Sequence, residues 1–563
     1  MNRETDLPRN VGVVLIILLS IAAYGTSLRG GFVWDDWTLI VENDSVKSWR
    51  TLGEILTSDF FYFGQSPLLS QKRGYYRPLV TLSYMGDYAL WGLNPLGFHL
   101  TNVVLHAAAS VLLLQLLTRL LAGQPWTAVL AVALFGAHPI HTESVSWISG
   151  RTDVMAGLFF SGAFYSYLRA HTPDPRAAEK APMIWTGCAV ISFSMAILCK
   201  EAAIVLPAVL VTYEYCLGSV GAKRDWKLLS RRLSPYALTG AAYVVVRFLV
   251  LGVKAPTNEW VAAQGTYSIF VTFIKAVGVY VSKLAVPWPL SAYYQTPMTS
   301  DLLHMRVVIP LTVLAGMGFL FWRRRKRHGL PLFLLLYFLW TLLPVSNVIP
   351  IGAPKDMGFL IAERFLYVPS AAFCVLLAWV LNRAADSFSQ RRRGPHLARA
   401  AFAVPVLAAY LVLTTARSAV WHDEIRFYTE TLKQAPDAGL LHYVLGIAYW
   451  EVGEKVGGKA EMREALRCNP SASWAHNNMG NMLYDDGDVF AAVQEWRIAV
   501  QTDPSNCQAW LNLARALDRW GQSAEAIIAY RSFLKSAPAS LVVHTEAARS
   551  RLAALAQSAR DRP

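Results

Sequence analysis

The feature that most constrains this chain of 563 residues is a series of long apolar stretches that carry almost no charge. A transmembrane helix needs about 20 mostly apolar residues, because the hydrocarbon core of a bilayer is about 30 Å thick. Candidate spans run near 11–28, 97–120, 124–140, 153–169, 182–199, 202–217, 234–253, 305–322, 330–346, 366–382 and 399–416. The sequence therefore predicts an all-α fold in which residues 1–420 form a polytopic transmembrane helical bundle with about 11 spans.

The composition supports a membrane protein and excludes a chain that is soluble throughout or disordered. Hydrophobic residues make up 54% of the chain and charged residues 16%, whereas soluble globular domains carry about 25% charged residues. The 19 Trp, 24 Tyr and 25 Phe residues exclude a disordered chain. The net charge of +14 comes from basic residues that stand in short runs between apolar stretches, which is typical of a membrane protein. We therefore expect a membrane and no nucleic acid as the partner.

Three clusters of basic residues set the predicted orientation. They lie at 223–232, 323–327 and 383–399, and the positive-inside rule places all three on the inner side together with the N-terminus. This parity holds only if the apolar segment 267–286 does not fully cross, so we predict that this segment is re-entrant or interfacial. In this topology the region after Arg417 lies on the outer side of the membrane, together with four loops at 29–96, 138–152, 254–304 and 347–365.

The C-terminal region, 421–557, is soluble in composition and repeats itself at an interval of 34 residues. The positions that recur are Pro436, Pro470, Pro504 and Pro538; Gly446, Gly480 and Ala514; Gly453, Gly487 and Gly521; and Trp496 with Tyr530. A closing proline and small residues at helix crossings are typical of tetratricopeptide repeats (TPRs). The pattern predicts an α-solenoid of three repeats, about 437–538, with a capping helix near 540–557. Such arrays bind an extended peptide or pack on a partner protein.

Two adjacent carboxylates, Asp35 and Asp36, follow the first span among aromatic residues. Burial and mutual repulsion would raise the pKa of at least one of them, which suits a general base or a metal site associated with phosphate. The alternative is a solvated acidic pair at the start of a helix. Arg77 precedes the second span, and His99 lies near the outer end of that span.

The second outer loop holds several ionisable residues: His138, His141, Glu143, Arg151 and Asp153. Their HxxHxE spacing could ligate a metal but matches no standard zinc motif, so we favour a hydrogen-bonded loop that caps a cavity.

Four further charged residues stand at the outer ends of later spans. Lys200 and Glu201 separate two spans, and Glu363 and Arg364 open another; the arginine would hold a phosphate or form an anchoring ion pair with its neighbour. Acids and bases thus gather on the outer face, whereas a transporter distributes them through the bilayer midplane. This arrangement favours an enzyme that acts at the outer interface on a lipid-attached substrate.

The order of these motifs resembles a known family. VWDD after the first span, YYRPL, FHLTNVVLH, HPIHTESVSWISGRTDV, CKE and AERFLYVPS, followed by TPRs, resemble the transmembrane-and-TPR O-mannosyltransferase family over about 10–540. The resemblance implies a class C glycosyltransferase fold and a polyprenyl- or dolichyl-phosphate sugar donor, with mannose as the favoured sugar. It also implies that the protein uses no metal and no other cofactor. The three repeats and compact loops are more like those of a bacterial relative.

The resemblance also implies roles for the residues. Asp35 or Asp36 would be the general base that deprotonates an acceptor hydroxyl, and the sequence leaves the choice between them open. The residues expected to bind or orient the substrate are Arg77, His99, His138, His141, Glu143, Arg151, Asp153, Lys200, Glu201, Glu363 and Arg364.

The expected partners are the lipid-linked sugar, the membrane, and an acceptor or adaptor protein on the TPR array. The expected location is a bacterial cytoplasmic membrane with the TPRs outside, or the endoplasmic reticulum membrane in a eukaryote. Two alternatives stand beside protein glycosylation. One is transfer of the sugar to a lipid or a surface polysaccharide, and the other is a non-catalytic TPR scaffold in the membrane.

Overall fold

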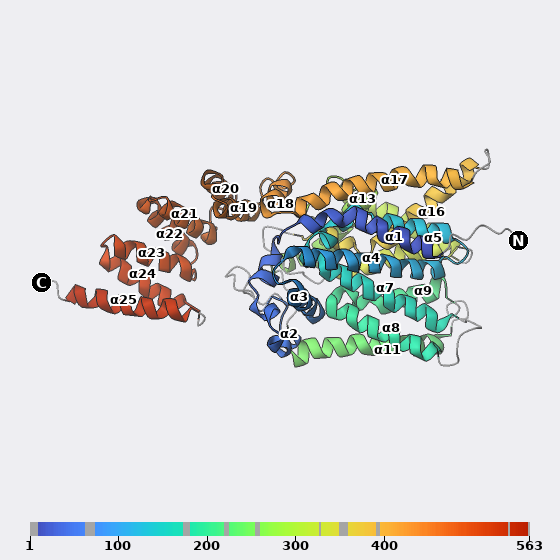
Figure 1. Ribbon diagram of the computed structural model, residues 1–563, viewed down its shortest axis with the longest axis horizontal. Coiled ribbons are helices and arrows are strands. Elements are labelled where there is room, and N and C mark those ends of the chain that lie inside the picture. The colour runs from blue at the N-terminus through green and yellow to red at the C-terminus, as the bar shows by residue number, and fades with distance from the viewer. Residues whose placement is uncertain are drawn as a thin grey trace. The chain divides into compact units, whose positions relative to one another are not determined.

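The computed structural model describes residues 9–61, 74–172, 181–218, 225–253, 259–325, 328–347, 359–389, 395–538 and 541–560 (Figure 1). These residues form helices and no β-strand, which confirms the predicted fold class. The chain divides into two compact units, Met1–Phe427 and Tyr428–Pro563. Several residues of the basic clusters lie outside the described ranges: Lys223, Arg224, Lys326, Arg327 and Arg391–Arg393.

The first unit contains a helix at every predicted span. These helices are α1 (Arg9–Tyr24), α4 (Pro95–Leu120), α5 (Pro125–Gly136), α7 (Arg151–His171), α8 (Ala181–Cys199), α9 (Leu206–Cys216), α11 (Trp226–Val245), α14 (Met305–Arg324), α15 (Leu330–Leu342), α16 (Ser370–Ser389) and α17 (Pro395–Ser418). Helices α1, α4, α7, α8 and α11 pack in that order side by side, and α5 packs on α16 (Figure 1). Tyr, Phe, Leu and Ala side chains of these helices form one continuous core.

The remaining elements of this unit are shorter or lie between the spans. The α-helices are α2 (Leu52–Thr57), α3 (Pro78–Trp91), α6 (Thr142–Val145), α12 (Glu259–Ala263), α13 (Gly265–Ala285) and the first residues of α18 (Glu424–Leu432). The short 3-10 and π turns are η1 (Gly25–Arg29), η2 (Trp37–Val41), η3 (Asp44–Lys47), η4 (Trp49–Thr51), η5 (Pro139–His141), η6 (Ile148–Gly150), η7 (Glu201–Val205), η8 (Val246–Val250), η9 (Leu343–Val345), η11 (Glu363–Leu366) and η12 (Ala419–Trp421).

By length and apolarity, 8 helical segments of the described residues qualify as membrane spans. They are Asn10–Arg29, Pro95–Leu120, Ala181–Cys199, Trp226–Val250, Gly265–Ala285, Met305–Arg324, Ser370–Phe388 and Leu397–Trp421. Pro125–Gly136 and Leu330–Val345 are apolar but shorter. Helix α7 carries charged residues at both ends, and α9 has 11 residues. The multi-pass bundle is therefore present, and its spans differ in length and polarity.

Helix α13 is part of a segment that returns to its starting side. After Ala285 the chain runs back along the helix: Lys283 Nζ donates to the carbonyl of Pro289 at 2.6 Å, and Lys275 Nζ donates to the carbonyl of Pro297 at 3.0 Å. Val307 of α14 then packs beside the first half of α13. Helices α13 and α14 thus run parallel. Because the chain returns to the start of α13 before α14 begins, α13 and the residues after it leave the chain at the end of the bundle where α13 began, as the predicted re-entrant segment requires.

The predicted outer loops meet at one end of the bundle. Trp147 Nε1 donates to the carbonyl of Val33 at 3.1 Å, which joins the first loop to the second. His138 Nε2 donates to the carbonyl of Leu284 at 3.2 Å, and the backbone N–H of Gly31 donates to the carbonyl of His422 at 2.7 Å. Residues far apart in sequence are therefore assembled on this one surface.

The second unit is a TPR solenoid. Its helices are α19 (Gly439–Glu451), α20 (Lys455–Cys468), α21 (Ser473–Asp485), α22 (Val489–Thr502), α23 (Cys507–Arg519), α24 (Ser523–Ser536) and α25 (Val542–Arg560), so equivalent helices begin 34 residues apart. Gly453, Gly487 and Gly521 have φ values of 89°, 87° and 76°, a conformation that glycine adopts without steric cost. The predicted repeats and capping helix are confirmed.

Gly150 provides a test of the loop packing. A Cβ atom there would lie 2.3 Å from the carbonyl oxygen of Glu143 and 2.7 Å from that of Ser144, both backbone atoms that cannot turn aside. We expect Gly150→Ala to lower the apparent Tm in detergent, at a cost of about 1–3 kcal/mol. Gly187→Ala is the matched control, because nothing lies within 4 Å of its Cβ position. Equal Tm values for the two variants would contradict this packing.

Candidate active site

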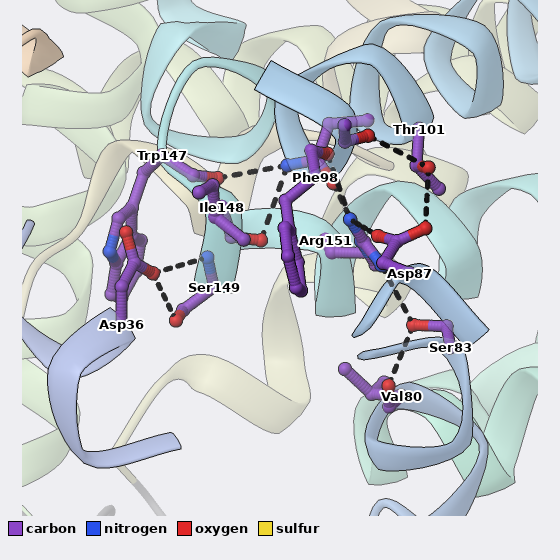
Figure 2. Close-up of polar contacts among 12 residues, drawn as sticks. Asp36, Val80, Ser83, Asp87, Phe98, Thr101, Trp147, Ile148, Ser149 and Arg151 are labelled. Carbon is purple, nitrogen blue, oxygen red and sulfur yellow. Dashed lines mark hydrogen bonds and ion pairs between the residues drawn. The ribbon is translucent and has the colours of Figure 1, made fainter. Parts of the chain in front are cut away.

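Asp36 is a buried carboxylate that joins two outer loops. Its Oδ1 accepts the backbone N–H of Ser149 at 2.8 Å and the Ser149 hydroxyl (Figure 2). Its Oδ2 accepts the backbone N–H of Val33 at 3.0 Å. The side chain is 1% exposed. Burial raises the pKa of Asp36 to about 7, although the donors from Ser149 and Val33 lower it. With its oxygens engaged inside the protein, Asp36 is placed to hold the loop rather than to contact a substrate.

Asp35 belongs to the same turn and is partly exposed. The preceding residue, Trp34, has a φ of 60°, which is rare for a bulky side chain. Its indole stacks on Trp147 with ring centroids 5.3 Å apart, and this contact holds the turn. Asp35 lies within electrostatic reach of Arg364. Of the two carboxylates, Asp35 is therefore the one that a substrate can approach.

Three ion pairs join residues of different outer segments, and one of them includes Arg364, which lies within electrostatic reach of Asp35. Arg77 Nε lies 3.1 Å from Glu201, and its guanidinium also stacks on Tyr75 at 4.5 Å. Lys200 Nζ lies 2.5 Å from Asp153. Arg364 pairs with Glu143 through its guanidinium, and its backbone N–H donates to the same carboxylate at 2.8 Å.

The three cations form one group. Lys200 lies within electrostatic reach of both Arg77 and Arg364, and burial lowers its pKa while Asp153 raises it. The side chains of Arg77 and Arg364 are 14% and 20% exposed, so part of each guanidinium remains accessible. The arrangement can therefore stabilise an anion that approaches from the surface.

A small cavity of about 30 Å³ lies beside Lys200 and Asp153. The rest of its lining is almost wholly apolar and comes from four parts of the bundle: Ala156, Phe160, Ala202, Ala203, Val205, Thr341, Val345, Phe365, Val368 and Pro369. Lys200 and Asp153 are thus the charged groups on the wall of a small, largely apolar cavity.

The three predicted histidines do not face this cavity. His99 is 1% exposed and donates from Nε2 to the carbonyl of Gly31 at 3.3 Å, below the first loop. His138 and His141 are fully buried, and His141 Nδ1 donates to the carbonyl of Phe135 at 3.0 Å. In this structure the three histidines pack the loops, and their role in substrate binding stays a prediction. Burial lowers the pKa of His138 to about 3, so its ring is neutral.

Two other predicted substrate residues are also buried. Arg151 is 0% exposed, and Asp87 lies 2.5 Å from its guanidinium. Glu363 is 2% exposed and accepts from the backbone N–H of Ser291 and from the Tyr294 hydroxyl, both at 2.6 Å. Burial raises the pKa of Glu363 to about 7, and Arg417 opposes the shift. Neither side chain reaches the surface at which a phosphate would arrive.

The side chains of the HxxHxE motif point to different partners. His138 turns to the end of α13, His141 to the end of α5, and Glu143 to Arg364. Within the described ranges, no group of three or more His, Cys, Asp or Glu side chains is placed to hold a metal ion.

Several contributors to the site were missed at the sequence level. Ser149 holds Asp36, and Asn102 donates to three carbonyls of the loop that contains Ser149. Asp87 neutralises Arg151 from α3, a helix that the sequence analysis did not predict. The one available signal was Gly150, because a glycine directly after a serine in a polar loop indicates a tight turn.

These features define a polytopic helical membrane protein with a charged site at one end of its bundle and a TPR domain. The chain matches the human protein O-mannosyl-transferase TMTC3 with 29% identity over 400 residues, which are 65% of this chain and 42% of TMTC3. It matches human TMTC4 with 27% identity over 504 residues, 80% of this chain and 64% of TMTC4. The chain is therefore homologous to these proteins, and the resemblance predicted from its motifs is confirmed.

Further similarities cover parts of the chain. Tmtc2 of Drosophila melanogaster, also a protein O-mannosyl-transferase, is 34% identical over 227 residues, 40% of this chain and 24% of that protein. A tetratricopeptide repeat family model matches residues 477–540. The crystal structure of ArnT from Cupriavidus metallidurans bound to undecaprenyl phosphate is similar with a TM-score of 0.41 and 14% identity, covering 77% of this chain and 80% of that chain. The chain spans less than two thirds of the length of the protein O-mannosyl-transferases that it matches.

The pKa of Asp36 leads to a prediction about stability. A carboxyl whose pKa is raised in the folded state stabilises the fold at low pH, and this contribution is lost as the pH rises through about 7. Asp36→Asn removes this titration. We therefore expect the apparent Tm of Asp36→Asn, minus that of the wild type, to rise between pH 5 and pH 8.5.

Measurement of Tm at a fixed scan rate in detergent tests this expectation. The substitution also places an amide N–H against the donors of Val33 and Ser149, but this penalty does not depend on pH. Asp44→Asn, which changes an exposed carboxylate paired with Lys47 in the same loop, is the control and should show a flat difference. A flat difference for Asp36→Asn as well would show that its pKa is not raised.

Proposed function

We propose that this protein is an integral membrane glycosyltransferase. It moves a sugar from a polyprenyl- or dolichyl-phosphate donor to a hydroxyl group on the outer or lumenal face. The favoured sugar is mannose, and the favoured acceptor is the hydroxyl of a Ser or Thr residue in a protein. The observation that carries the proposal is a partly exposed carboxylate, Asp35, within electrostatic reach of Arg364 in the cationic group beside the cavity. The names of the homologues support mannose as the sugar and protein as the acceptor.

The chemistry follows from these positions. The carboxylate of Asp35 takes the proton of the acceptor hydroxyl, and the acceptor oxygen forms a bond with the anomeric carbon of the sugar. The bond between that carbon and the phosphate oxygen breaks, so the lipid phosphate leaves with the electron pair. Attack from the side opposite the leaving group inverts the anomeric centre.

The cationic group serves the leaving phosphate. Arg77, Lys200 and Arg364 each have a carboxylate partner but use only part of their N–H groups for it. The remaining N–H groups donate to the phosphate as its negative charge grows, an interaction that is strong where water is excluded.

The TPR solenoid binds the acceptor protein or an adaptor, since such arrays present an extended surface for peptides. The catalytic end of the bundle faces away from the cytosol. The membrane is the cytoplasmic membrane in a bacterium and that of the endoplasmic reticulum in a eukaryote.

The first test replaces the proposed base. We expect Asp35→Asn to lower kcat for transfer from polyprenyl-phosphate mannose by about 10²–10⁴-fold, because the acceptor hydroxyl loses its proton acceptor. The measurement follows radiolabel from the donor to protein with purified full-length chain in detergent. Asp44→Asn is the control and should keep the wild-type rate. An unchanged rate in Asp35→Asn would remove this residue from the mechanism. If none of the sugar donors in a panel were turned over, the transferase function would be refuted.

A second test concerns the acceptor. A chain that ends at Phe427 lacks the TPR unit. If the acceptor is a protein, we expect transfer to protein to fall at least about tenfold, while transfer to a short Ser/Thr peptide stays within about twofold, because only the large substrate needs the second binding surface. Transfer to lipid or polysaccharide that is unaffected by the truncation would instead favour the alternative acceptor.

A further inference from the structure

A buried polar network lies behind the site, and the proposed mechanism does not use it. Arg151 is its centre: the guanidinium pairs with Asp87, donates to the carbonyl of Phe98 at 2.8 Å and reaches the Ser83 hydroxyl at 3.2 Å (Figure 2). Asp87 also accepts from the Thr101 hydroxyl at 2.7 Å. The network thus ties together α3, α4 and the start of α7.

The network continues from Arg151 through one side chain to the second outer loop. Arg151 Nε donates to Oδ1 of Asn102 at 2.6 Å, which fixes the orientation of this amide. Asn102 Nδ2 then lies within hydrogen-bond distance of the carbonyls of Trp147 at 3.0 Å and Ile148 at 3.2 Å (Figure 2). A side chain that is 0% exposed therefore holds the backbone of the turn directly before Ser149.

When the Ser149 turn is held in this position, it presents two hydrogen-bond donors to the first outer loop. The backbone N–H and the hydroxyl of Ser149 both donate to Asp36 (Figure 2). The other carboxylate oxygen of Asp36 accepts the N–H of Val33. Asp35 is the neighbour of Asp36 in this same short turn. A shift of the Ser149 turn would therefore move the carboxylate that faces the substrate.

We propose that Asn102 and Arg151 are positioning residues that fix the Ser149 turn, and through Asp36 set the location of the Asp35 carboxylate. The inference rests on the proposed function and extends it to two side chains that no substrate touches. The chain of contacts runs from Asp87 to Arg151, Asn102 and Ser149, and each member is buried. A displacement of a reacting group by about 1 Å costs up to about 10²-fold in rate, so the network acts on kcat.

General stabilisation of the fold is the competing explanation, and the network itself argues against it. A buried ion pair adds little stability over apolar residues of the same volume, because both charges lose their hydration. A packing role is met by any residues that fill the space. Here the polar contacts end on the backbone carbonyls of one catalytic turn.

The experiment uses the full-length protein and three variants: Asn102→Ala, Ser149→Ala and Arg151→Lys. Arg151→Lys keeps the buried charge opposite Asp87 but cannot also reach Asn102, so it provides a second measurement if Asn102→Ala folds poorly. Tyr167→Phe is the matched control, since it removes a buried 2.7 Å hydrogen bond to Glu214 outside this network. Each variant is also made in the Asp35→Asn background.

The expected result is a fall in kcat of about tenfold or more for all three variants, with KM for donor and acceptor within about twofold. Tyr167→Phe should keep its kcat even where its apparent Tm falls as far. In the Asp35→Asn background the three substitutions should have no further effect, because the group that they position is gone. Amide hydrogen exchange of residues 33–37 should be faster in each of the three.

Two outcomes would overturn the inference. One is an equal loss of rate with and without Asp35; the other is unchanged hydrogen exchange at 33–37. The exchange measurement needs no turnover, so it decides the positioning role even if the wild type transfers no sugar and the proposed function fails.

Discussion

The rest of the outer surface depends on the burial of one carboxylate. Burying Asp36 is costly because a carboxylate loses its hydration, and three donors from two loops offset this cost. Two of those donors belong to Ser149, which lies 113 positions further along the chain. The first and second outer loops are therefore held as one structure, and the residues on either side of Asp36 have fixed positions.

The ion pairs extend the same principle to the remaining loops. Arg77 and Glu201 are 124 positions apart, and Glu143 and Arg364 are 221 apart. Apolar helices in a bilayer pack with little preference for one neighbour over another, since lipid tails are as apolar as their side chains. Half-buried charge pairs at the ends of the spans are more selective, because breaking one leaves an unpaired charge. The cations that we propose to stabilise the leaving phosphate are thus also the contacts that bring the loops together.

The sequence predicts the elements of this fold better than the directions of its side chains. Spans and repeats follow from composition and period, so every predicted span has its helix, and the 34-residue interval recurs in the TPR unit. Exposure depends on which helix arrives beside a residue. His99, His138 and Arg151 are predicted from the sequence to bind substrate, yet all three are buried. The start of the first loop contacts His99, the end of α13 contacts His138, and α3 contacts Arg151. Asp87 and Ser149 carry no local pattern and emerge only from the tertiary contacts.

The choice between Asp35 and Asp36 shows how a single strained residue separates two roles. Stacking on Trp147 offsets the unfavourable left-handed backbone conformation of Trp34. Trp147 itself stacks on Trp421, with ring centroids 5.7 Å apart. In the turn that results, Asp36 is bound to Ser149 inside the protein, whereas Asp35 is partly exposed and within electrostatic reach of Arg364. In an extended strand successive side chains alternate, but there a shift of register exchanges them. The stacked indoles remove that freedom, so two identical side chains keep different environments and different chemistry.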